Sequence, residues 1–222
     1  IFRWNVDFMK QILKIAIPNG MENGVFQLVK VALSSIVALF GTSQIAANGV
    51  AQSIWSLAAL VGSAMGPVFI TVIGQCMGAK DVDQAKFYFS KLIKWSLVFS
   101  IVWNVLVLAI TPCILQFYNL TYETKHLIFI LVIIHNIANT VVFPLSGPLS
   151  QGLRATGDVK FTMIVSIAST VGGRLVLSII LALKLNLGVI GIALAMCGDW
   201  TIRAIIFYYR YKSNAWTKFE VI

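Results

Sequence analysis

The sequence predicts an all-α membrane protein in which six transmembrane helices form one bundle. Composition is the first reason: 59% of the residues are hydrophobic and only 11% are charged, whereas soluble domains carry about 25% charged residues. The second is three long runs without Asp, Glu, Lys or Arg, at 31–79, 95–122 and 127–153. A spanning helix needs about 20 apolar residues, so the first run is long enough for two spans. Most of these runs also lack a polar face at helical period.

Polar turns set the limits of the predicted helices. The segment "IFRWNVDFMKQILK" predicts a cytoplasmic amphipathic arm at residues 1–13, with Phe2, Trp4, Phe8 and Ile12 as apolar membrane contacts. The turns follow at "GTSQ", "GQCMGAKDVDQAK", "YNLTYETKH", "RATGDVK" and "KLNLG". The predicted spans are therefore 14–40, 45–75, 86–118, 126–153, 161–183 and 189–211, forming a bundle over 14–213 with a cytoplasmic tail at 214–222.

The basic residues predict the orientation. Six spans place both termini on one side, and that side carries twelve of the 17 Lys and Arg residues. They are Arg3, Lys10, Lys14, Lys80, Lys86, Lys91, Lys94, Arg154, Lys160, Arg210, Lys212 and Lys218. The opposite side carries only Lys125 and Lys184. Cytoplasmic loops are enriched in positive charge, so we expect a multi-pass protein of the plasma (inner) membrane with both termini cytoplasmic.

Several other functions have no support in the sequence. The net charge of +9 is spread between the apolar runs, so it does not form the basic face of a nucleic-acid-binding protein. Cys76, Cys113 and Cys197 lie far apart in apolar segments and form no metal or disulfide pattern. Motifs that pair a nucleophile with a base are absent, as is a P-loop. We therefore expect no enzymatic activity, no metal and no cofactor.

The stretch "PNGMENGVFQLVK" places polar groups on a spanning helix. On a helix turning about 100° per residue, six side chains fall within a sector of about 140°: Asn19, Glu22, Asn23, Gln27, Lys30 and Ser34. Such a stripe is expected to face the bundle interior or water rather than lipid. We interpret it as the lining of a wet cavity that contains a cation-coupling site at Glu22.

Glu22 and Lys30 leave a choice open. They lie eight residues apart, about 12 Å along a helix, so they cannot pair directly. Glu22 could exchange a proton or bind a cation, or it could be the structural partner of a basic residue on another helix. For Lys30 the sequence favours neither a functional nor a structural role.

Two later helices carry further polar groups. The fourth predicted helix holds His135, Asn136 and Asn139, and Pro144 and Pro148 follow. Prolines inside a span kink the helix, as in the broken helices of transporters, although such a kink can also serve only to shape the bundle. We assign Asn136 and Asn139 to the cavity and regard His135 as a packing residue.

The last predicted helix carries a local charge pair. Asp199 and Arg203 are four residues apart, which predicts a structural ion pair. Arg174, in the middle of the fifth predicted helix, needs an acidic partner or a cavity.

Four segments together resemble a known family: "IPNGMENGVFQLVKVALSSIVALFGTSQIAANGVAQSI", "GQCMGAKDVDQAK", "LRATGDVKF" and "DW" followed by Arg203. They are similar to the second half of multidrug and toxic compound extrusion (MATE) transporters, over nearly the whole chain. The resemblance implies a fold of two six-helix bundles around a central cavity, with this chain as the C-terminal bundle. On this interpretation an N-terminal half precedes Ile1.

The resemblance also implies an activity. MATE transporters export cationic or lipophilic compounds in exchange for H⁺ or Na⁺, so the expected partners are such a small molecule, membrane lipid and the N-terminal six-helix half, but not nucleic acid. Glu22 matches the functional glutamate of the family. The family's coupling aspartate on the fourth helix has no counterpart, since Asn136 and Asn139 occupy that region.

Two alternatives to drug efflux remain. An exporter of lipid-linked sugars or polysaccharides would share the architecture, and Lys30 and Arg174 suit the cationic cavity of such proteins. A non-transporting six-span scaffold is also possible, although it would not need a polar stripe. A channel would need a pore loop or a charge ring, and the sequence shows neither.

Overall fold

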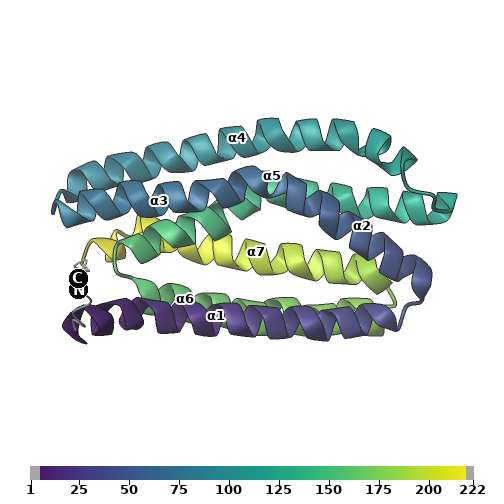
Figure 1. Cartoon of the computed structure of the whole chain (residues 1–222), viewed down its shortest axis with the longest axis horizontal. Helices are drawn as coiled ribbons and strands as arrows, with labels where there is room; N and C mark the ends of the chain where they lie inside the picture. Colours follow the sequence, from purple (N-terminus) through teal and green to yellow (C-terminus); the bar gives the residue numbers. More distant parts are fainter. Residues whose placement is uncertain (1–5, 219–222) are drawn as a thin grey trace, which may run out of the picture.

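The structure, a computed structural model, describes residues 6–218 of the chain. Its elements are α1 (Val6–Ala38), α2 (Thr42–Ala58), α3 (Leu60–Gly78), α4 (Val82–Gln116), α5 (Tyr122–Ala155), α6 (Val159–Ala168), the π-helices η1 (Ser169–Val176) and η2 (Ile179–Lys184), α7 (Gly188–Lys212) and the 3₁₀-helix η3 (Ala215–Lys218). Figure 1 shows one elongated bundle in which α1 begins at the end where η3 lies. The predicted all-α fold class is confirmed.

Within residues 6–218, five segments are long and apolar enough to cross a membrane: α3, α4, α5, the continuous stretch Val159–Lys184 and α7. α1 is not among them, because its charged and amide side chains lower its hydropathy, and α2 is only 17 residues long. The number of six spans therefore stays a prediction. α1 is continuous from Val6, so residues 6–13 extend the first helix, whereas Phe2, Trp4 and the side chain of Phe8 lie outside the described residues.

The predicted helix at 45–75 is two helices in the structure, separated by Ala59. The Trp103 indole nitrogen on α4 donates to the Leu57 carbonyl at 2.8 Å. A helix break inside a membrane is tolerated where neighbouring groups satisfy the freed backbone. A side chain more than 40 positions away in sequence thus stabilises a break that the local sequence did not predict.

α5 lies at the centre and packs against α2, α3, α4 and α7. Among the described residues three apolar clusters fill the bundle: one includes Val29, Leu33 and Val37 of α1, a second surrounds Phe69 and Phe89, and a small third one contains Met196 and Trp200. α1 packs mainly against α6, η1 and α2, along one edge of the bundle (Figure 1). This arrangement leaves a space between α1 and the neighbouring helices α2 and α7, where the candidate site lies.

Candidate functional site

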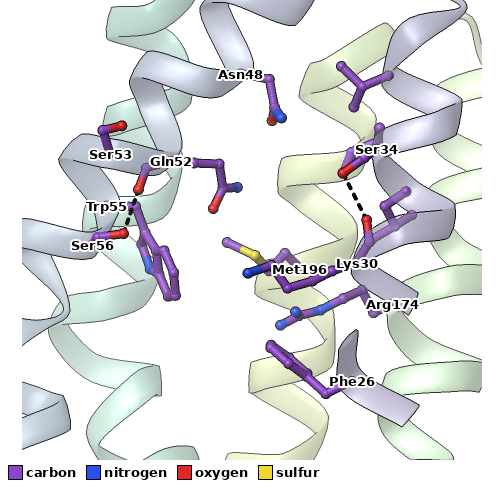
Figure 2. Close-up of a pocket in the computed structure, with 13 residues that line it drawn as sticks. Phe26, Lys30, Ser34, Asn48, Gln52, Ser53, Trp55, Ser56, Arg174 and Met196 are labelled. Atoms are coloured by element: carbon purple, nitrogen blue, oxygen red, sulfur yellow. Dashed lines mark hydrogen bonds between the residues drawn. The ribbon is translucent and has the colours of Figure 1, made fainter. Parts of the chain in front are cut away.

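A cavity of about 310 Å³ lies between α1, α2, η1 and α7. Its lining residues are Phe26, Lys30, Leu33, Ser34, Val37, Asn48, Gln52, Ser53, Trp55, Ser56, Arg174, Ile192 and Met196. Figure 2 shows Lys30 and Arg174 on one side of it, with Asn48, Gln52 and Trp55 across from them. The cavity is therefore lined by charged, amide and apolar side chains together.

The α2 side of the cavity carries amides and an aromatic ring. Asn48, Gln52 and Ser56 are spaced by four residues and share one helix face. The Ser56 hydroxyl donates to the Gln52 carbonyl at 2.9 Å, but no described side chain pairs with the Asn48 or Gln52 amide. Trp55 stacks on Trp200 of α7 with ring centroids 5.6 Å apart. Two free amides beside a fixed aromatic ring can orient a bound organic molecule.

A cluster of buried charged residues lies on the side of the cavity opposite α2. Asp199 on α7 is fully buried; its Oδ2 forms an ion pair with Arg174 Nη2 at 2.9 Å and accepts a hydrogen bond from Arg203 Nη2 at 2.8 Å. The Ser169 hydroxyl donates to Asp199 Oδ1 at 2.6 Å. The Arg174 guanidinium also lies 4.9 Å from the centre of the Phe26 ring, a cation–π distance. The Asp199 carboxylate therefore pairs with both arginines, of which Arg174 lines the cavity.

A second ionic contact joins α1 to the end of α5. Arg154 Nη2 donates to the Glu22 carboxylate and Nη1 to the Asn19 side-chain oxygen, while Nε donates to the Thr162 hydroxyl at 3.3 Å. The side chains of Arg154 and Glu22 are 11% and 18% exposed. This contact places Glu22 in an interhelical ion pair.

A family model described as MatE matches residues 18–180, which is most of the chain. The chain belongs to the MatE family. The resemblance to MATE transporters is thereby confirmed.

Individual MatE relatives are distant. The chain is 24% identical over 219 residues to the uncharacterized transporter YisQ of Bacillus subtilis, covering 97% of this chain and 47% of the relative. It is 25% identical over 174 residues to a probable multidrug resistance protein NorM of Bacillus cereus, covering 75% and 37%. The chain thus spans about half the length of the curated relatives it matches.

The fold is also similar to a solved structure. An outward-facing multidrug resistance MATE family transporter matches with a TM-score of 0.80 at 20% identity, over 96% of this chain and 47% of that protein. At this identity the likeness shows the fold alone.

In this MatE bundle the residues of the predicted polar stripe on α1 lie in different environments. Lys30 and Ser34 line the cavity, whereas Asn19 and Glu22 contact Arg154. Asn23 and Gln27 are exposed in the described chain, and the Asn23 amide donates back to the Asn19 carbonyl at 3.0 Å. The stripe is thus not the wall of one site.

The predicted cavity residues on α5 lie elsewhere. Asn139 is buried and donates to Asn104 of α4 at 3.2 Å. Asn136 is also buried, with no partner for its amide nitrogen among the described residues. Neither residue lines the cavity described above. His135 is buried beside Trp200, with ring centroids 6.5 Å apart, and neither of its ring nitrogens has a hydrogen-bond partner among the described residues.

Sequence reasoning missed several residues of these MatE sites. Arg154 was assigned only to the cytoplasmic loop charge, Asn48 and Gln52 were not considered, and Trp55 was expected at a membrane interface or in packing. The four-residue spacing of Asn48, Gln52 and Ser56 was a usable signal, since it marks a polar face on an otherwise apolar helix. The contact of Arg154 with Glu22 spans 132 positions and had no local signal.

Proposed function

We propose that this chain is the C-terminal bundle of a secondary active efflux transporter, which exports an organic compound in exchange for H⁺ or Na⁺. The observation that carries the proposal is the cavity beside α1, which Lys30, Arg174 and two unpaired amides line in an otherwise apolar bundle. Polar groups are costly inside a membrane and mark substrate or ion pathways.

Family membership supports transport. The chain belongs to the MatE family, and one relative carries the description of a probable multidrug resistance protein. Because the chain spans about half of such relatives, a second six-helix bundle is the expected partner. The two bundles would enclose the transport pathway, with membrane lipid around them.

The proposed coupling site is Glu22. A transport cycle needs a coupling ion that binds one conformation better than the other, since only differential affinity shifts an equilibrium. H⁺ or Na⁺ at the Glu22 carboxylate would compete with Arg154 for the same oxygens. Ion binding would therefore weaken the contact between α1 and α5, and ion release would restore it.

The proposed location is the plasma membrane, with both ends of this chain cytoplasmic. The excess of basic residues at one end of the bundle supports this orientation. Arg154 and Glu22 would then lie toward the cytoplasm.

The test is dye extrusion from cells that lack their own exporters. The chain is expressed alone and together with the N-terminal bundle. We expect the chain alone to insert without extruding dye, and co-expression to restore part of the efflux. Full extrusion by the chain alone would contradict the two-bundle requirement, and no extrusion by the complete protein for any of a panel of organic dyes would contradict efflux.

A second candidate, export of a lipid-linked sugar or polysaccharide, is favoured by the cations Lys30 and Arg174 in the cavity. Such substrates carry phosphates, which pair with basic side chains. Deletion of the gene separates the two candidates: loss of surface polysaccharide without change in drug sensitivity favours the sugar exporter, and the reverse favours drug efflux.

A further inference from the structure

The charges around the cavity do not balance. Lys30, Arg174 and Arg203 are cationic, and Asp199 is the carboxylate that contacts the two arginines. The α2 wall contributes only uncharged side chains. Among the described residues, Glu22 is held by Arg154 and Asp158 by Arg210, so neither neutralises this group.

Burial makes this imbalance costly. The side chains of Arg174 and Asp199 are 4% and 0% exposed, and that of Arg203 is 13% exposed. The Nε atoms of both arginines have no partner among the described residues. A charge buried without a full partner destabilises the folded protein. Arg174 and Arg203 share the single carboxylate of Asp199, and Arg174 lines the cavity, so the cluster keeps a net positive charge beside the cavity.

The cavity can accommodate an anion with an apolar body. Lys30 has no acidic partner among the described side chains, and Figure 2 shows it beside Arg174 at the cavity. The rings of Phe26 and Trp55 and the Met196 side chain provide apolar surface next to these cations. The Asn48 and Gln52 amides lie across the space and can donate hydrogen bonds.

We propose that this cavity binds an organic anion, with its phosphate or carboxylate group held by Lys30 and Arg174 and its apolar part against Phe26 and Trp55. The proposal rests on the transport function above and narrows its substrate class. It differs from the cationic or lipophilic compounds that the family resemblance implied, because the bound group is an anion.

The test compares two small probes that differ in charge. Phenyl phosphate and phenyltrimethylammonium share a benzene ring and dissolve in water without entering micelles strongly. Calorimetry on the complete transporter in a neutral detergent is expected to show phenyl phosphate binding about tenfold more tightly, with the difference shrinking as salt screens the charges. Equal affinity, a preference for the cation, or no binding of phenyl phosphate would overturn the proposal.

Matched variants locate the binding site. Lys30→Gln removes one cavity cation and is expected to weaken phenyl phosphate binding about tenfold, whereas Lys94→Gln makes the same change on exposed α4 surface and should leave it unchanged. Gln52→Glu adds a carboxylate opposite the cations and should abolish phenyl phosphate binding. If both cavity variants bind phenyl phosphate like the parent protein, the anion does not occupy this cavity and the proposal fails.

A lipid headgroup and a soluble substrate share this chemistry, and nanodiscs separate them. If an anionic lipid occupies the cavity, phosphatidylglycerol discs will lower the affinity for phenyl phosphate relative to phosphatidylcholine discs. Unchanged affinity identifies a soluble anion as the occupant. Dye extrusion by the same protein tests the transport function separately, so active extrusion with a preference for phenyltrimethylammonium would overturn only the anion proposal.

Discussion

Glu22 on α1 and Arg154 in the last turn of α5 form an ion pair although 132 positions separate them in sequence. Arg154 also donates to Asn19 on α1 and to Thr162 on α6. One guanidinium thus joins the three helices α1, α5 and α6. Any process that removes the charge of Glu22 acts directly on this junction.

The first prediction is that Glu22→Gln lowers efflux by the complete transporter about tenfold or more, because the amide cannot bind the coupling ion that shifts the conformational equilibrium. Gln keeps an oxygen that can accept from Arg154, so protein abundance should stay above half of the parent level. Dye extrusion and an immunoblot on the same cells provide the two values.

The control for this prediction is the double variant Glu22→Gln with Arg154→Gln, which removes both charges. It should match the parent in abundance and still fail to extrude dye. If the double variant regains efflux, Glu22 serves only to neutralise Arg154, and the coupling role is wrong.

Glu22 and Arg154 show which part of the site can be predicted from the sequence and which part cannot. The polar stripe of α1 was predictable because helical period places Glu22 and its neighbours on one side. The separation of this stripe into cavity-lining residues and residues that contact Arg154 was not predictable. Arg154 lies at the end of another helix, and its side chain reaches α1 only in the folded bundle. By contrast, the pairing of Asp199 with Arg203 was visible because the two lie one helical turn apart.

The second prediction concerns stability. Asp199→Asn leaves Arg174 and Arg203 without a carboxylate, and breaking a buried ion pair costs about 3–5 kcal/mol. We expect a clear loss of abundance and a lower Tm in detergent, measured by fluorescence-detected size exclusion after heating. Asp83→Asn is the control, because its pair with Lys86 is exposed and contributes little. Parent-like stability of Asp199→Asn would show that the cluster is not needed for folding.

The third prediction concerns topology. Single cysteines at Lys86 and Asn214, in a background without Cys76, Cys113 and Cys197, should react with impermeant thiol reagents only from the cytoplasm. A cysteine at Thr121 should react only from outside, because basic residues favour the cytoplasmic side. Labelling of Lys86→Cys and Thr121→Cys from the same side would refute the six-span arrangement.

The fourth prediction concerns the close packing of α7 and η2. A Cβ atom at Gly191 would lie 2.7 Å from the Ala182 nitrogen and the Leu181 carbonyl carbon, both backbone atoms. Gly191→Ala should therefore lower the Tm, as overpacking costs about 1–3 kcal/mol. Gly74→Ala is the matched control, since no atom lies within 4 Å of its added Cβ. Equal melting of the two variants would contradict this contact.

The helices themselves were largely predictable, because charge-free runs and polar turns mark them in the sequence. Irregularities within the helices were not. The break at Ala59 depends on the distant Trp103 indole, and the π-helical turns around Arg174 have no simple signature in the sequence. The sequence indicated that Arg174 needs a partner, but only the fold shows that the partner is Asp199.

The central claim is that the transported compound passes through the cavity beside α1, and its most direct test uses a cysteine at Gln52. In the complete transporter without its other cysteines, a bulky thiol reagent on Gln52→Cys should block dye extrusion, because it fills a cavity of about 310 Å³. Transported dye should slow that reaction, while Asn214→Cys reacts at the same rate with or without dye. Normal extrusion by fully labelled Gln52→Cys protein would contradict the claim.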